Sequence, residues 1–200
     1  MLKYFLFFVL SMPAFAQGPL SFGVKGGVPL TDAFEVAQTG DFGYVQDTKR
    51  WTLGPMIQLN LPVGFAVEFN AMYRRLNYNT TDVEQRGVRA NSWQFPLLLK
   101  YRFGDGSVRP YIAGGGAFQH ITDIKQVSRI LGESENTPEL NERNNVGAVI
   151  AGGIQLGGGG LSISPEIRYT RWGSENFRDN FRELLRFNKN QAEFLIGITF

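Results

Sequence analysis

The 200-residue chain has no cysteine, a single histidine and nearly balanced charge, and each of these shortages excludes a class of protein. Without cysteine there is no disulfide framework, no thiolate nucleophile and no Cys-ligated zinc or iron–sulfur site. With His120 alone, a metal site that needs two imidazoles is excluded, and no cofactor is expected. Twenty basic against eighteen acidic residues give a net charge of +2, which does not indicate a nucleic-acid partner.

After residue 16 the chain also lacks any run of about 18 apolar residues, so no helix is expected to span a membrane. Glycine, by contrast, is abundant at 24 residues, and so are aromatic side chains, with 17 Phe, 7 Tyr and 3 Trp. A composition of 43% hydrophobic and 19% charged residues excludes a disordered chain. These numbers leave a globular or membrane protein without obvious catalytic groups.

Residues 1–16, MLKYFLFFVLSMPAFA, have the layout of a secretory signal peptide. Lys3 supplies the positive start, Tyr4 to Leu10 form a short apolar core, and Ala14 to Ala16 form a small-x-small cleavage site. The apolar core is too short to cross a bilayer as a helix. We expect export and cleavage after Ala16, which makes 17–200 the mature domain; the alternative is a retained N-terminal anchor.

Apolar and polar residues alternate with a period of two along most of 17–200, as is typical of strands with two different faces. The clearest segments are 65–74, 93–103, 161–169 and 192–200, and weaker ones are 20–28, 51–61, 111–120 and 146–156. These segments are about 9–13 residues long, which matches membrane-spanning strands of about 9–11 residues better than ordinary strands of about 5–6.

The connections between the eight expected strands alternate in length. Long polar segments lie at about 29–50, 75–91, 121–145 and 172–190, and short turns lie at 61–64, 104–107 and 157–160. Short turns at one end and long loops at the other are typical of outer-membrane barrels. We therefore predict an all-β fold, an eight-stranded antiparallel up-and-down transmembrane β-barrel with short periplasmic turns and long extracellular loops.

In such a barrel the polar face lines the lumen, because Arg or Lys on the lipid face costs about 2–4 kcal/mol at the bilayer midplane. Eight strands enclose a space that side chains just fill, so we expect an internal network of paired charges and no wide pore. Glu68 and Lys100, on neighbouring strands, are one such pair. The expected network consists of Lys25, Glu68, Arg74, Lys100, Arg102, Glu166, Arg168 and Glu193.

Aromatic residues fall near both ends of the expected strands. Two aromatic girdles at the membrane interfaces are typical of transmembrane barrels. We assign Trp51, Tyr73, Trp93 and Tyr169 to the long-loop rim, and Tyr101 and Tyr111 to the short-turn rim.

With these features the chain resembles the small outer-membrane β-barrel proteins of Gram-negative bacteria, a group that contains porin-family and OmpA/OmpX-like barrels. The resemblance covers nearly all of 17–200, and its most specific element is 190–200, where apolar residues at every second position precede a terminal Phe. It implies that the barrel assembly machinery recognises Phe194, Ile196, Ile198 and Phe200. It also implies an outer-membrane location in contact with lipid and lipopolysaccharide. We expect a monomer and, because the chain stops at Phe200, no periplasmic domain.

The role expected from these features is structural or interactive, not enzymatic, and two alternatives are open. In the first, the protein is a lipid-modifying barrel enzyme that uses His120, the only conventional general base, with Ser128, Asp123 or Glu133. In the second, it is a secreted soluble barrel whose charges are solvated and which binds an apolar ligand.

The last long connection contains an amphipathic stretch. From 175 to 188, apolar and basic residues recur at helical spacing, with Phe177, Phe181, Leu184 and Leu185 on one stripe and Arg178, Arg182 and Arg186 on another. This stretch is interpreted either as a loop that caps the barrel mouth or as a short helix on lipopolysaccharide headgroups or on a partner.

Overall fold

The computed structural model describes residues 19–31, 34–36, 44–45, 51–80, 86–128, 132–134, 144–158, 160–173 and 185–200. The expected signal peptide and the side chains of the amphipathic stretch up to 187 lie outside this description. Among the described residues, no helix is long and apolar enough to cross a membrane.

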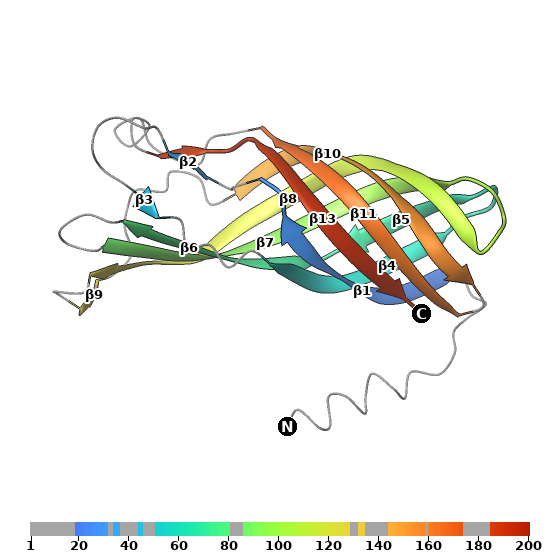
Figure 1. The fold of residues 1–200 in the computed structure, drawn as a ribbon, viewed down its shortest axis with the longest axis horizontal. Coiled ribbons are helices and arrows are strands. Elements are labelled where there is room, and N and C mark those ends of the chain that lie inside the picture. Colours follow the sequence, from blue (N-terminus) through green and yellow to red (C-terminus); the bar gives the residue numbers. More distant parts are fainter. Residues whose placement is uncertain are drawn as a thin grey trace, which may run out of the picture.

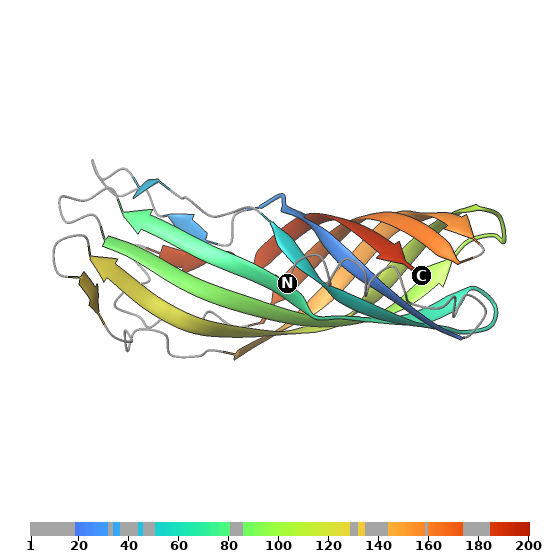
Figure 2. The same cartoon turned by 90° about the horizontal axis from the view of Figure 1, so that it is seen from below.

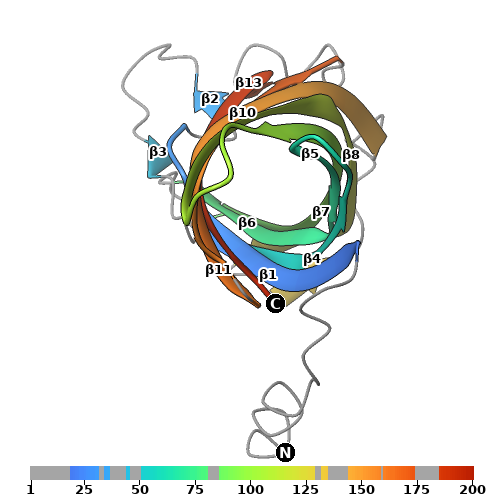
Figure 3. The same ribbon diagram turned by 90° about the vertical axis from the view of Figure 1, so that its right-hand side faces the viewer.

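Antiparallel strands close into one barrel (Figures 1 and 3). Each strand of the ring pairs with its neighbours in sequence, and the ring closes where β1 pairs with β13, with Val24 opposite Ile198. In chain order the strands are β1 (Leu20–Pro29), β4 (Thr52–Asn60), β5 (Phe65–Asn70) continued by β6 (Met72–Thr80), β7 (Arg86–Arg102), β8 (Val108–Ser128), β10 (Asn144–Gly158), β11 (Leu161–Trp172) and β13 (Asn190–Thr199). Because β5 and β6 form one strand interrupted at Ala71, the predicted eight-stranded up-and-down barrel is confirmed.

The interruption at Ala71 coincides with a close approach of two backbones. A Cβ atom at Gly54 of β4 would lie 1.9 Å from the carbonyl oxygen of Ala71. Only glycine permits this approach, and the amide of Ala71 still donates to the carbonyl of Pro55 at 3.1 Å. The ring is therefore continuous across the break.

The two faces of the sheet are inverted relative to a soluble protein. On β4, Leu53 and Ile57 are exposed on the outside, whereas Thr52 and Gln58 are buried inside the ring. The contrast is large, since Ile150 on the outside is 64% exposed and Lys25 on the inside is 0% exposed. An apolar outer surface of this kind is stable in hydrocarbon and not in water.

Four short strands lie at the long-loop end. They are β2 (Phe34–Val36), β3 (Tyr44–Val45), β9 (Gly132–Ser134) and β12 (Leu185–Phe187). Strand β3 pairs with the end of β6, β9 pairs with the end of β8, and β2 pairs with β12. Strands β3 and β9 thus extend the barrel sheet beyond the ring, whereas β2 and β12 form a separate two-stranded sheet (Figures 1 and 2).

Two of the expected long loops are largely strand. The expected loop 75–91 is occupied by the end of β6 and the start of β7, and β8 continues to Ser128 although a loop was expected from residue 121. These extensions form a sheet at the long-loop end (Figure 2). The sequence does not reveal them because the alternation of apolar and polar residues reflects the contrast between lipid and lumen, which ends at the membrane surface.

Candidate functional site

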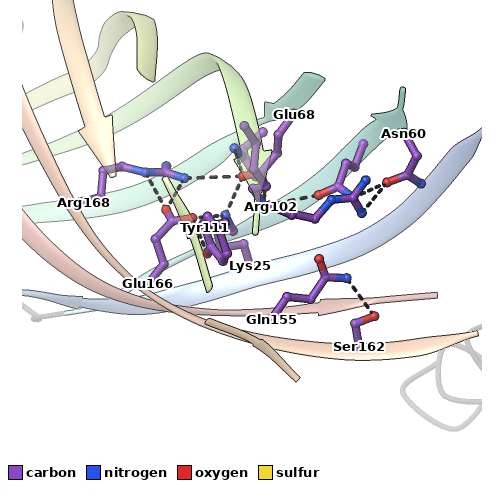
Figure 4. Close-up of polar contacts among 12 residues, drawn as sticks. Lys25, Asn60, Glu68, Arg102, Tyr111, Gln155, Ser162, Glu166 and Arg168 are labelled. Carbon is purple, nitrogen blue, oxygen red and sulfur yellow. Dashed lines mark hydrogen bonds and ion pairs between the residues drawn. The ribbon is translucent and has the colours of Figure 1, made fainter. Parts of the chain in front are cut away.

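Charged side chains from opposite walls of the barrel meet in the middle of the lumen (Figure 4). Alternation along each strand turns these residues inward, and all of them are at most 3% exposed. We call this group the central network. Its members are Lys25 of β1, Glu68 of β5, Lys100 of β7, Tyr111 of β8, and Glu166 and Arg168 of β11.

Lys25 joins the two carboxylates of the network. Its Nζ donates to Oε1 of Glu68 at 2.5 Å and to Oε2 of Glu166 at 2.9 Å. Lys100 donates to Oε2, the other oxygen of Glu68, and to Oε1 of Gln58 at 3.2 Å. Because Asn70 also donates to Glu68 at 3.0 Å, that carboxylate is fully engaged.

Glu166 is held in the same way from the other side. Arg168 lies with Nη2 at 2.7 Å from Oε1 of Glu166 and at 3.6 Å from Oε1 of Glu68. The hydroxyl of Tyr111 donates to Oε2 of Glu166 at 2.9 Å, and its ring lies 4.3 Å from Nζ of Lys100. Three cations thus surround two carboxylates, which is the pairing that charges removed from water require.

Two glycines leave room for this network. A Cβ atom at Gly197 of β13 would lie 3.2 Å from Cε of Lys25. At Gly153 of β10 it would lie 2.6 Å from the hydroxyl of Tyr111. The absence of side chains at these two inward positions allows the long side chains to lie across the lumen.

A smaller polar group lies nearer the long-loop end. Arg74 contacts Oε1 of Glu193 at 3.4 Å and donates to Oε1 of Gln191 at 2.8 Å. On the neighbouring strands β7 and β8, Gln119 donates to the hydroxyl of Ser92 at 2.9 Å, and Ser92 is the cross-strand partner of Arg74. The lumen therefore changes from ionic in the middle to mainly neutral and polar towards the long loops.

Arg102 departs from the expectation that every charge in the lumen is paired. It lies at the short-turn end and donates to Oδ1 of Asn60 at 3.0 Å and to the carbonyls of Gly64 and Phe65 at 3.4 and 3.3 Å. It forms no ion pair with any carboxylate of the described residues. All its partners are neutral.

Aromatic side chains outside the barrel gather near both rims. Tyr73 lies between Trp51 and Trp93, with ring centroids 6.0 and 5.2 Å away, near the long loops, where Tyr169 is also exposed. Near the short turns, Tyr101 lies 4.8 Å from Phe65 and 4.9 Å from Phe103.

Tyr111 was expected in the outer girdle, and this placement is corrected. The side chain is 2% exposed and lies inside the barrel, where it binds Glu166. The error arises because the glycines that follow Tyr111 hide which face of the strand is apolar. Ala113 is the cross-strand partner of Lys100, which faces the lumen, and Tyr111 lies two residues before Ala113 on the same face of the strand. This pairing would have assigned Tyr111 to the lumen.

His120 lies on the outer face of β8, since its neighbour Gln119 is fully buried in the lumen. Its Nδ1 is 2.6 Å from Oδ1 of Asn144, and it borders a shallow apolar groove with Trp93, Phe95 and Phe118. The side chains of the expected partners Ser128, Asp123 and Glu133 lie outside the described residues. Within the described part of the chain, no three His, Asp or Glu side chains are grouped as metal ligands.

The C-terminal strand presents its apolar residues to the outside. Phe194, Ile196 and Phe200 are 37%, 44% and 43% exposed, and Ile198 shares their face. Leu195 and Thr199, which alternate with them, are buried inside the barrel.

A closed barrel with an apolar outer face and an ionic interior defines an integral outer-membrane protein. Residues 15–173 match the profile of the family described as outer membrane protein beta-barrel domain, so the chain belongs to that family. No curated protein sequence matches the chain.

Among solved structures, the outer membrane protein OprG from Pseudomonas aeruginosa is similar at 11% identity and a TM-score of 0.55, over 90% of this chain and 94% of OprG. Neisserial surface protein A, at 11% identity, and the attachment invasion locus protein Ail of Yersinia pestis, at 14%, each have a TM-score of 0.49 over the same shares of chain. The likeness to OprG concerns the fold alone.

Replacing Glu68 by Gln is expected to destabilise the barrel strongly, because Lys25 and Lys100 would lose the carboxylate they share. Removing one partner of a buried ion pair typically costs about 3–5 kcal/mol. The free energy of unfolding is measured by urea titration of the barrel refolded in detergent micelles.

Glu193→Gln is the matched control, because it removes a single ion-pair contact of 3.4 Å. Its loss of stability is expected to be clearly smaller. Equal losses in the two variants would contradict a central role for Glu68.

Proposed function

We propose that this protein has a structural and interaction role in the outer membrane, with a lumen filled by side chains instead of a wide pore. The observation that carries the proposal is the central network, in which Lys25 links Glu68 to Glu166. A hydrated ion would have to separate these paired charges to pass. Their mutual attraction in a medium of low dielectric constant opposes that separation.

The wild-type protein is therefore expected to give no large, steady single-channel currents in planar bilayers. The double variant Glu68→Ala/Lys100→Ala removes one anion and one cation at the same depth, and we expect it to conduct more often than the wild type. Steady currents from the wild type, at the level of a wide porin, would contradict a filled lumen.

The interaction part of the proposal concerns the long-loop end. The extensions of β6, β7 and β8 form a sheet beyond the ring, and they offer a surface to partners outside the cell. The outer aromatic side chains, such as Trp51 and Trp93, suit the headgroup region of lipid and lipopolysaccharide. Because a single chain closes the ring, we propose that the protein acts as a monomer. We also propose that its role is not enzymatic.

Phe194, Ile196, Ile198 and Phe200 are proposed as the signal recognised by the barrel assembly machinery. Their common outward face supports the proposal, since a binding partner can contact all four from one side. Phe200→Ala is expected to slow the appearance of the heat-modifiable folded form in cells several-fold, while refolding of the purified variant in detergent stays close to wild type.

Thr199→Ala, next to it on the inner face, serves as the control and is expected to assemble normally. If Phe200→Ala refolds as slowly in detergent as it assembles in cells, the residue contributes to folding of the barrel itself and not to recognition.

The alternative of a lipid-modifying enzyme depends on His120. Among the described residues its Nδ1 contacts the amide oxygen of Asn144 and not a carboxylate, and this contact does not favour His120 as a general base. Cells that produce His120→Ala are expected to have the same lipid A composition, by mass spectrometry, as cells that produce the wild type. A modified lipid A that appears only with the wild type would support the enzyme instead.

The alternative of a secreted soluble barrel conflicts with the inverted faces. Such a protein would hide Ile150 and Ile167 in its core, yet these residues are 64% and 59% exposed. The charged side chains that line the lumen would also not suit an apolar ligand.

A further inference from the structure

The charges that face the lumen do not balance among the described residues. Lys25, Lys100 and Arg168 share Glu68 and Glu166, and Arg74 contacts Glu193. The inward cations are Lys25, Arg74, Lys100, Arg102, Arg109 and Arg168, and the inward carboxylates are Glu68, Glu166 and Glu193. The guanidinium groups of Arg102 and Arg109 are therefore left without a described carboxylate.

These two arginines lie side by side at one end of the barrel. Arg102 is the last residue of β7, Arg109 is the second residue of β8, and a short turn connects the two strands. Arg102 pairs with Tyr111, so Arg109 is its diagonal neighbour on the same inward face, with about 7–8 Å between diagonal positions. Because short turns lie on the periplasmic side, both arginines are at the periplasmic mouth of the lumen.

The surroundings of the pair leave its positive charge uncompensated. Arg102 donates only to neutral oxygens, those of Asn60, Gly64 and Phe65. The Nε of Arg109 is buried and has no hydrogen-bond partner among the described residues. Asp105, in the turn between them, is exposed and forms no ion pair with either arginine. Two neighbouring like charges repel one another, and an anion between them would remove that repulsion.

We propose that Arg102 and Arg109 form a binding site for a phosphate group at the periplasmic mouth of the lumen. The planar guanidinium group donates two parallel hydrogen bonds to phosphate oxygens, and two such groups suit a doubly charged or multiply hydrogen-bonded oxyanion. Asn60, which already orients Arg102, lines the same mouth. The site is reached from the periplasm and lies on the near side of the central network, so the ligand has no need to cross the barrel.

The phosphate group has two possible sources with the same chemistry. One is inorganic phosphate or a soluble phosphate ester in the periplasm. The other is the headgroup of a phospholipid in the inner leaflet of the outer membrane. The site is tested by calorimetric titration of the refolded barrel in phosphate-free octyl glucoside micelles, first with inorganic phosphate and then with short-chain phosphatidylglycerol.

Arg102→Gln and Arg109→Gln are each expected to weaken binding at least tenfold. Arg171→Gln, an exposed position on β11 near the long loops, is the matched control and is expected to bind as the wild type does. Saturable binding of inorganic phosphate with this pattern supports a soluble ligand, and the same pattern with phosphatidylglycerol alone supports a headgroup. Absence of saturable binding to either, or equal binding by all variants, overturns the proposal.

A second measurement on the wild type covers the case in which a variant does not fold. Phenylglyoxal modifies accessible arginines, and the extent at each residue is measured by peptide mass spectrometry. Whichever of inorganic phosphate and short-chain phosphatidylglycerol binds in the titration is expected to slow modification of Arg102 and Arg109 several-fold and to leave modification of Arg171 unaffected. Equal rates with and without ligand overturn the proposal.

Discussion

The structure depends on one constraint, which is that hydrocarbon accepts apolar side chains and rejects charged ones. A strand that presents every second residue to lipid must turn its other residues inward, so a closed barrel collects the charges of its membrane-spanning segments in one narrow space. In the middle of the barrel these charges have lost water and are stable only in mutual contact. The contacts of Lys25 with Glu68 and Glu166 are therefore the counterpart, inside the barrel, of the apolar surface outside.

This constraint also explains the pattern of small residues. Long ionic side chains reach across the lumen only if the opposite wall leaves space for them. Gly197 leaves it for Lys25 and Gly153 leaves it for Tyr111. Gly197 thus serves the packing of the interior alone, in contrast to Gly54, where two backbones approach each other. Gly153 does both, because a Cβ atom there would also lie 2.4 Å from the carbonyl oxygen of Pro165.

The sequence predicts the features that depend on whether a side chain faces lipid or the lumen. Alternation alone gives the number of strands, the inward direction of Glu68 and the neighbourhood of Glu68 and Lys100. It does not give contacts between distant strands, such as the one between Lys25 and Glu166, because these depend on how the strands are staggered when the ring closes. Alternation also fails to place Tyr111, because the glycines that follow it do not show which face of the strand is apolar. It fails to predict the strand extensions as well, because they lie beyond the membrane surface, where the contrast between lipid and lumen ends.

The length of β8 has a geometric consequence. With 21 residues at about 3.4 Å each and a tilt of about 40°, the strand rises roughly 50 Å, whereas the apolar band of such barrels is about 25 Å tall. Roughly half of its height therefore stands clear of the hydrocarbon. A macromolecule held there would sit well above the plane of the headgroups, and its size would not be limited by the packing of the lipids around the barrel.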